Sequence, residues 1–245
     1  MILKNKNVLV TGASKGIGRA CAEAFAAQGA NIIVHYNSDE AAAREVAKAV
    51  TAHGVKAFVV QANISVQTQV DAMYDQIAKE VGVIDVLVNN AGAFAEGDLD
   101  NIHGIQKEFD TNFFGEIRVT NAVRKLMKEG KIIFISSIHG KLGNGRPSVI
   151  GYAASKAALD SYMKNLAKAL APNILVNAIA PGRTDTPMWE GTDEETRAAL
   201  ASEVLIERWI DPSEIADGAV FLAKNDAMCG ELLVIDGGMS LKTLG

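Results

Sequence analysis

Short runs of consecutive apolar residues alternate with longer segments of helical periodicity along almost the whole chain. The short runs are rich in β-branched residues, as is typical of strands buried on both faces of a sheet. They cover residues 8–10, 32–34, 58–60, 86–88, 132–135, 174–179 and 232–235. The helical segments cover residues 19–28, 40–53, 66–81, about 105–128, 152–170 and 212–224. Repeated strand–helix–strand units predict a doubly wound α/β fold, in which a parallel sheet of about seven strands carries helices on both faces.

Several boundaries between these segments carry residues that end or begin helices. Gly29, Gly54 and Gly82 follow the first three helical segments, where a left-handed residue commonly ends a helix. Asp211 before Pro212 predicts a capped helix start with proline in the first position. No Pro/Ser-rich linker and no repeat of fixed period interrupts the series, so we predict one domain over residues 1–245.

The first predicted strand runs directly into a glycine-rich turn, residues 11–18, and a helix follows. Glycine allows the backbone to turn tightly beside a pyrophosphate, and the start of the helix offers free N–H groups and a positive dipole. The spacing Gly-x3-Gly-x-Gly differs from the usual G-x-G-x-x-G of Rossmann domains, but its place after the first strand predicts the same use, and hence a Rossmann-like fold. The residues predicted to contact a dinucleotide here are Gly12, Ser14, Lys15, Gly16, Ile17 and Gly18.

The end of the second strand indicates which nucleotide binds. Enzymes that use NAD usually place an acidic side chain there to hold the ribose hydroxyls, whereas this strand ends in His-Tyr-Asn-Ser, with no acid before Asp39. Asn37 and Ser38 can donate hydrogen bonds to a 2′-phosphate, and Lys15 can supply positive charge. These residues predict NADP(H). The alternative is that Lys15 is a solvated loop residue and Asp39 swings in to bind the ribose.

A tyrosine and a lysine in the long helical segment form a candidate catalytic pair. Tyr152 and Lys156 are four residues apart, so they share one face of a helix. A free tyrosine is a poor base at neutral pH because its pKa is about 10, and a nearby ammonium favours the phenolate. Ser137 ends the fifth predicted strand, and its hydroxyl can donate to a substrate carbonyl; Ser136 is the competing candidate.

Composition excludes several other classes of protein. Hydrophobic residues make up 49% of the 245 residues and charged residues 22%, with a formal net charge of −5, so nothing favours nucleic acid or an anionic membrane as a partner. Two cysteines form no disulfide framework, and Cys21 is expected to be a small buried hydrophobe. The four histidines lack metal-ligand spacing, and no signal peptide or membrane span is expected. We therefore expect a soluble, cytoplasmic protein without a metal.

Taken together and in order, these motifs resemble those of the short-chain dehydrogenase/reductase family. The resemblance spans about residues 5–240 and includes T-G-x3-G-x-G, N-N-A-G at 89–92, Asn112, Ser137, Y-x3-K, and P-G-R-T-D-T at 181–186. It implies hydride transfer between a nicotinamide and a carbonyl or alcohol carbon. The implied catalytic residues are Asn112, Ser137, Tyr152 and Lys156, with Ser137 preferred over Ser136 and Asn112 orienting a water beside Lys156. The implied cofactor contacts are Asn63, Ile64, Asn90, Ala91, Gly92, Tyr152, Lys156, Pro181, Gly182, Thr184 and Thr186.

Within the family, the pattern is most similar to the 3-oxoacyl-(acyl-carrier-protein) reductases, which implies a 3-oxoacyl thioester or a similar ketone as substrate. Those reductases dock an acidic carrier protein on basic residues near the turns before strands five and six, and here the second of those turns, 171–173, carries no cation. A sugar, a polyol or a steroid-type alcohol stays open as the substrate. Arg183, Lys141 and Arg146 indicate either an anionic substrate or three solvated loop cations. The resemblance also implies a homodimer or homotetramer.

Residues 185–210 are polar at first and then amphipathic. A lid that closes over the substrate is one interpretation, and an ordinary surface helix is the other. A different class of function is a nucleotide-sensing protein that keeps the fold without catalysis. Such proteins typically lose the tyrosine or the lysine, and both are present here.

Overall fold

The computed structural model describes residues 1–94, 101–141 and 147–242, and its centre is one parallel sheet. Seven strands follow one another in the order β3-β2-β1-β4-β5-β6-β7. Their bounds are β1 Asn7–Val10, β2 Asn31–Tyr36, β3 Ala57–Gln61, β4 Val86–Asn89, β5 Gly130–Ile135, β6 Ile174–Pro181 and β7 Leu232–Ile235. The doubly wound α/β sheet predicted from the apolar runs is therefore confirmed.

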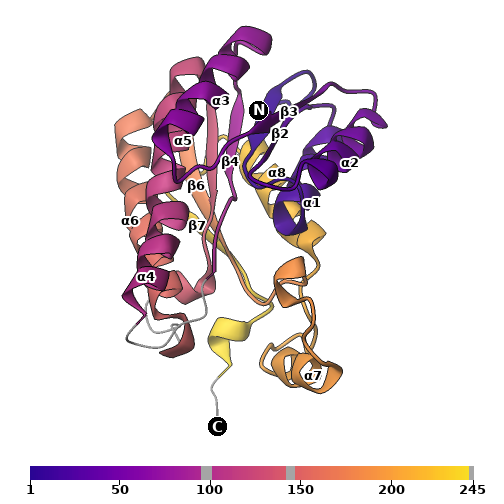
Figure 1. Ribbon diagram of the computed structural model, residues 1–245, viewed down its shortest axis with the longest axis vertical. Coiled ribbons are helices and arrows are strands. Elements are labelled where there is room, and N and C mark those ends of the chain that lie inside the picture. Colours follow the sequence, from indigo (N-terminus) through magenta and orange to yellow (C-terminus); the bar gives the residue numbers. More distant parts are fainter. Residues whose placement is uncertain (95–100, 142–146, 243–245) are drawn as a thin grey trace.

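Helices cover both faces of this sheet (Figure 1). On one face, α1, α2 and α8 pack around Phe25 and Ile215; on the other, α3, α5 and α6 pack around Met73 and Phe134. The helix bounds are α1 Gly16–Ala27, α2 Glu40–Thr51, α3 Gln67–Glu80, α4 Ile102–Phe109, α5 Glu116–Val123, α6 Ile150–Leu170, α7 Glu194–Ser202 and α8 Pro212–Lys224. Among the described residues, no helix combines the length and apolar character that crossing a membrane requires.

The strand order reverses at β1, which pairs with β2 on one side and with β4 on the other. The helices that follow β1 and β4 lie on opposite faces of the sheet. Central strands are buried on both sides, so their side chains are apolar at successive positions rather than at alternate ones. In open α/β sheets, ligands bind beyond the carboxyl ends of the strands at such a reversal. The topology therefore places a binding site next to the loops that follow β1 and β4.

The helix boundaries follow the expected chemistry in most places. Gly29, Gly54 and Gly82 have positive φ angles of 82°, 77° and 84°. Cys21 is completely buried in α1, as predicted.

One predicted helix, at about 105–128, is instead four segments. Between α4 and α5 lies a π-helical turn, η1 Asp110–Gly115, and a short 3-10 helix, η2 Arg124–Leu126, follows α5. A π turn inserts one extra residue and is frequent at functional sites. Gly115 closes it, and a Cβ there would lie 2.8 Å from Cγ1 of Ile64. Because this contact comes from a distant loop, helical periodicity alone did not predict the break.

Candidate active site

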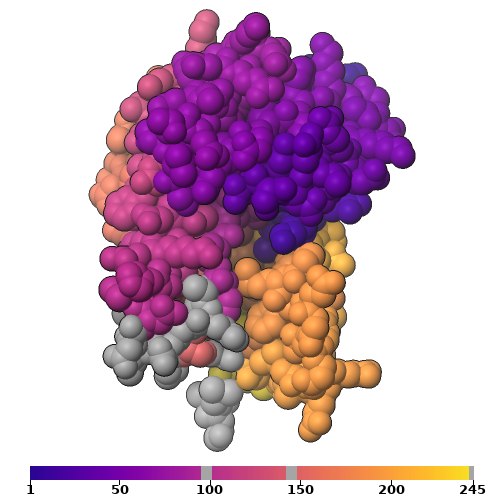
Figure 2. Space-filling view, viewed as in Figure 1, coloured from indigo at the N-terminus to yellow at the C-terminus, as the bar shows by residue number. Residues whose placement is uncertain are grey.

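A cavity of about 1340 Å³ lies at the carboxyl ends of the strands. In Figure 2 it is hollowed between the magenta helices and the orange segment that carries α7. Every predicted site residue lines this cavity except Gly18 and Asn112. Those that line it are Gly12, Ser14, Lys15, Gly16, Ile17, Asn37, Ser38, Asn63, Ile64, Asn90, Ala91, Gly92, Ser137, Tyr152, Lys156, Pro181, Gly182, Thr184 and Thr186.

The glycine turn has the backbone geometry that a phosphate needs. Gly12 and Gly16 have φ angles of 61° and 54°, a region that side chains other than glycine rarely adopt. Lys15 is the N-cap of α1, and its side chain makes no capping hydrogen bond. The first N–H groups of α1 are thus left to face the cavity, as suits an anion at a helix N-terminus.

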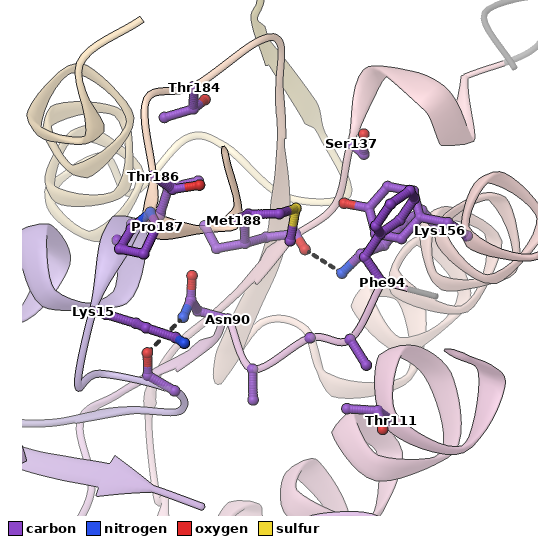
Figure 3. A pocket seen from close by; sticks show the side chains of 18 of the residues that line it. Lys15, Asn90, Phe94, Thr111, Ser137, Lys156, Thr184, Thr186, Pro187 and Met188 are labelled. Atoms are coloured by element: carbon purple, nitrogen blue, oxygen red, sulfur yellow. Dashed lines mark hydrogen bonds between the residues drawn. The ribbon is translucent and has the colours of Figure 1, made fainter. Parts of the chain in front are cut away.

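The loop that follows β4 holds this glycine turn in place through hydrogen bonds. The hydroxyl of Thr11 accepts hydrogen bonds from the backbone N–H groups of Asn90 and Ala91 at 2.8 and 2.9 Å. The amide of Asn90 donates to the carbonyl oxygens of Thr11 and Gly12 at 2.8 and 3.2 Å, and its side chain lies beside Lys15 in Figure 3. Asn90 therefore shapes the phosphate turn with its side-chain nitrogen while it lines the cavity.

His35 joins the ends of three neighbouring segments. Its Nδ1 accepts the N–H of Gly12 at 3.0 Å, so Nε2 carries the proton and donates to the carbonyl of Ala62, also at 3.0 Å. Complete burial lowers the pKa of His35 from 6.5 to about 4. A neutral imidazole thus fixes the glycine turn against the loops that follow β2 and β3.

The residues expected to choose the nucleotide line one cavity. Asn37 and Ser38 follow β2 and Lys15 belongs to the glycine turn, and Asp39, the acid of the alternative, lines the cavity as well. The carboxylate of Asp39 accepts the N–H of Ala42 at 3.0 Å and so caps α2. This bond occupies one oxygen of the acid that the alternative assigned to the ribose, and it favours the set that suits a 2′-phosphate. In the adjacent loop, the side-chain oxygen of Asn63 accepts the N–H of Ser65 at 3.0 Å.

The Tyr152–Lys156 pair projects from the first turns of α6 into the cavity. The ammonium nitrogen of Lys156 donates to the carbonyl of Ile135 at 2.8 Å and lies 6.0 Å from the centre of the Tyr152 ring. The edges of Phe94 and His139 flank that ring at centroid distances of 5.7 and 6.5 Å. Figure 3 shows Lys156 and Ser137 on the same side of the cavity.

The two serines after β5 both line the cavity. The hydroxyl oxygen of Ser137 accepts the N–H of His139 at 3.2 Å, which fixes its orientation at the start of a short 3-10 helix, η3 Ile138–Gly140. With its lone pair engaged in this way, the Ser137 hydroxyl keeps its proton free to donate.

Asn112 lies in the π turn directly behind the cavity wall. Its side-chain oxygen accepts the N–H of Ala93 at 2.7 Å, and its nitrogen donates to the carbonyl of Ala93 and to the hydroxyl of Ser155 at 2.9 and 3.2 Å. The Asn112 amide therefore ties the loop after β4 to α6.

The segment after β6 reaches across the cavity. Thr186 lies above the glycine turn, because a Cβ on Gly16 would lie 3.3 Å from its Cβ. A 3-10 helix, η5 Pro187–Trp189, follows, and Met188 and Trp189 line the cavity. Figure 3 shows Thr186 and Pro187 on the side where Lys15 and Asn90 lie, and Met188 extending from them toward Lys156.

Arg183 is not the solvated cation that one interpretation expected. It is buried, its guanidinium pairs with Glu203 at 2.6 Å, and it lies 5.4 and 5.7 Å from the rings of Trp189 and Trp209. Of the other two cations in that group, Lys141 is exposed, and Arg146 lies outside the described residues.

Sequence reasoning missed several residues that this site depends on. Thr11 could have been found because it is the first residue of the glycine motif. Glu116 could have been found because it is an acid one helical turn after Asn112. His35 carried no such signal, because its role depends on contacts with Gly12 and Ala62. Within the described ranges, no group of three His, Cys, Asp or Glu side chains gathers to hold a metal.

The glycine turn lies where the strand order reverses, and Tyr152 and Lys156 of α6 enter the same cavity. Together they define a nucleotide-dependent oxidoreductase of the α/β type. The chain matches a family described as "Enoyl-(Acyl carrier protein) reductase" over residues 12–240. It belongs to the short-chain dehydrogenase/reductase family, as its motifs predicted.

Similar proteins cover this chain almost end to end. It is 38% identical to a 3beta-hydroxysteroid dehydrogenase 1 of Eggerthella lenta, over 98% of this chain and 95% of that one. It is 36% identical to a 3-oxoacyl-(acyl-carrier-protein) reductase of Aquifex aeolicus, over 97% and 98%. The crystal structure of a short-chain dehydrogenase from Burkholderia cenocepacia J2315 in complex with NADP superposes with a TM-score of 0.90 at 32% identity, covering 98% of this chain and 100% of that chain.

Proposed function

We propose that this protein is an NADP(H)-dependent oxidoreductase that transfers hydride between the nicotinamide and a carbonyl or alcohol carbon, with Tyr152 as proton donor and acceptor. One observation carries the proposal: Tyr152 and Lys156 enter, from one helix face, the same cavity that the glycine turn lines. A tyrosine and lysine outside that cavity would be an ordinary helix pair.

The residues that line the cavity fit NADP(H). Positive φ angles at Gly12 and Gly16 and the uncapped start of α1 suit the pyrophosphate. Lys15, Asn37 and Ser38 suit the 2′-phosphate, and the NADP complex of the similar Burkholderia cenocepacia protein supports this choice. When bound, NADP(H) supplies or accepts the hydride. Pro181, Gly182, Thr184 and Thr186 line the same cavity and would hold the nicotinamide.

The remaining chemistry is done by side chains of the chain itself. During reduction, the phenol of Tyr152 gives its proton to the carbonyl oxygen, while the hydroxyl of Ser137 donates a hydrogen bond to the same oxygen. The ammonium of Lys156, held by the carbonyl of Ile135, stabilises the phenolate that this leaves. Asn112 fixes the backbone at Ala93 beside α6, where we expect a water to return the proton through Lys156.

A 3-oxoacyl thioester or a similar ketone is the substrate class that we propose. The similarity to the Aquifex aeolicus reductase supports it. The substrate end of the cavity is lined by Phe94, Met188 and Trp189, which suit an apolar chain. The same apolar wall and the 38% identity to a steroid dehydrogenase support a steroid-type alcohol as the second candidate.

Absorbance of NADPH, followed with 3-oxoacyl thioesters, small ketones, sugars and a 3-ketosteroid, tests the proposal. We expect turnover with NADPH well above that with NADH. Tyr152→Phe should lower kcat by a factor of about 10³ or more while changing NADPH affinity less than about threefold, because only the proton is removed. Turnover like that of the unmodified chain in Tyr152→Phe would contradict the assignment. Tight NADPH binding without turnover on any substrate would favour a nucleotide-sensing protein.

The lid, the assembly and the location belong to the same proposal. We propose that residues 185–210 close over the substrate, which the position of Met188 and Trp189 on the cavity wall supports.

A cytoplasmic homodimer or homotetramer is expected from the family. Ile102 and Phe114, exposed on α4 and η1, offer apolar area to a second copy, and sedimentation equilibrium measures the assembly.

A further inference from the structure

Glu116, the first residue of α5, is a carboxylic acid in the interior that the chemistry above does not use. Its relative exposure is 0%, and neither of its carboxylate oxygens has a hydrogen-bond partner among the described residues. An acid buried without hydrogen bonds destabilises a fold, so its presence next to a candidate active site calls for a physical reason.

The charge that Glu116 faces is Lys156. Its Oε1 lies 3.9 Å from the ammonium nitrogen, and the Lys156 side chain is only 4% exposed. Burial raises the pKa of Glu116 from 4.5 to about 8, and the neighbouring Lys156 ammonium acts against that rise. With its pKa raised to about 8, Glu116 stays neutral at neutral pH and becomes negative at higher pH, 3.9 Å from the lysine that we assign to Tyr152.

Few other charges face this interior. Asp160 lies one helical turn after Lys156; burial raises its pKa, and Ser136, Lys156 and Lys164 oppose that rise. On the elements packed against α5 and η1, α4 carries the buried Glu108, whose carboxylate lies against Gly151 at the start of α6.

In the part of the chain that the structure describes, the other neighbouring elements bring no buried charge to Glu116. Helix α3 turns Val70, Met73 and Ile77 inward, and strand β4 contributes the amide of Asn89, which donates to the hydroxyl of Thr120 at 2.8 Å. On its own segment, Arg118 reaches away to the carbonyl of Asp110 at the surface. Lys156 is thus the charged group through which Glu116 acts on the site.

We infer that Glu116 is a positioning residue that sets the pH range over which Tyr152 exchanges its proton, acting through Lys156. The inference rests on the proposed function. When Glu116 is neutral, the ammonium 6.0 Å from the Tyr152 ring favours the phenolate undiminished. When Glu116 is ionised, its negative charge offsets part of that field, and the phenol keeps its proton to higher pH.

Replacement of Glu116 by a neutral side chain should therefore move the pH dependence in one direction. In Glu116→Gln, the alkaline limb of the kcat profile for ketone reduction should shift toward neutral pH by about one unit. In the oxidation direction, the acid limb should shift to lower pH by a similar amount, because the phenolate then forms more readily. Glu116→Asp keeps an ionisable carboxyl and should restore most of the original profile.

The experiment measures kcat and kcat/KM with NADPH from about pH 6 to about pH 10. Glu116→Met, which removes the carboxyl without burying another polar group, is the second variant if the amide prevents folding, and it should show the same shift. Asp85→Asn is the control: Asp85 is a buried carboxylate that pairs with Lys6 at 2.8 Å and accepts the N–H of Asn7 at the opposite end of the sheet, so its loss should leave the profile in place.

The two proposals fail differently. If Tyr152→Phe is inactive and the profiles of Glu116→Gln and Glu116→Met superimpose on that of the unmodified chain, the inference about Glu116 is wrong and the catalytic assignment stands. If Tyr152→Phe is active, the catalytic assignment itself is wrong. A shift that Asp85→Asn reproduces equally would overturn the inference, because it would come from buried charge in general.

Discussion

Gly18 is a residue whose side chain, a single hydrogen, is required by the packing of the phosphate turn. A Cβ at this position would lie 2.3 Å from the carbonyl oxygen of Gly12 and 2.4 Å from the amide nitrogen of Asn90. Both atoms belong to the brace that shapes the glycine turn. Gly18 does not line the cavity, so it acts on the cofactor only through these two neighbours.

Gly18→Ala should therefore weaken cofactor binding along with stability. The methyl group forces the turn and the Asn90 amide apart, which we expect to destabilise the fold by about 1–3 kcal/mol and to raise the NADPH dissociation constant by roughly tenfold or more. Calorimetric titration and chemical denaturation measure the two effects.

Gly54→Ala is the control for this variant. Gly54 also has a positive φ, 77°, but a Cβ there meets no atom within 4 Å. Its replacement should destabilise the fold by about 1 kcal/mol through backbone strain alone and leave NADPH affinity unchanged. Equal NADPH affinity in both variants would contradict the bracing role of Gly18.

The helical element α7 is held to the rest of the molecule by very few contacts. None of its residues is buried, and in Figure 1 it projects at the end of the molecule where the strands finish. Trp209 is one of its attachments: the indole N–H donates to the carbonyl of Arg197 at 3.1 Å, and the Arg197 guanidinium lies 4.4 Å from the ring. Asp185, which pairs with Arg197 at 2.8 Å, and Lys242, which donates to the carbonyl of Ser202, are the others that the described residues show. On its other side, Trp209 meets Trp189 at 5.1 Å.

Trp209→Leu should loosen α7 while the sheet stays intact. Loss of one hydrogen bond and the stacked guanidinium removes about 2 kcal/mol of local stability, so amide exchange over α7 should become roughly 30-fold faster. We expect KM for the ketone to rise, since Trp189 on the cavity wall loses its support, and the Tm to change little. Phe221→Leu, at an exposed aromatic on α8, is the control and should alter neither quantity. Unchanged exchange in Trp209→Leu would contradict this role.

For the whole molecule, two buried groups with opposite pKa shifts limit the pH range of stability. Burial lowers the pKa of His35 to about 4. Its contribution to the free energy of unfolding is therefore complete above pH 6.5 and is lost as the pH falls through 4. Glu116 has its pKa raised to about 8, also by burial, so its contribution is complete below pH 4.5 and is lost as the pH rises through 8. Each group is stable in its neutral form inside the fold.

Denaturation by urea at a series of pH values should show both limits. In His35→Gln, the fall in unfolding free energy between about pH 6.5 and pH 4 should be smaller by about 3 kcal/mol than in the unmodified chain. In Glu116→Gln, the fall toward alkaline pH should be reduced instead, and the acid side should keep its slope. Variant curves that run parallel to the original at all pH values would contradict these assignments.

Much of the fold followed from local rules. Five of the six helices and all seven strands predicted from periodicity occur with ends shifted by a few residues, because strands buried on both faces and amphipathic helices leave different apolar repeats. The π turn in the segment at about 105–128 was not anticipated, and the helix α7 was anticipated only as one of two interpretations of residues 185–210. The π turn depends on packing against Ile64, and α7 buries no side chain that periodicity could have indicated.

The sequence by itself determined the order of strands and helices, the glycine turn after β1 and the shared helix face of Tyr152 and Lys156, because each depends on residues within a few positions of one another. Only the tertiary structure decided that Asn90 supports the glycine turn, that Arg183 lies against Trp209, and that Glu116 faces Lys156. Those contacts join residues far apart in the chain, and their electrostatic effects depend on distance and burial, which exist only once the sheet has brought the segments together.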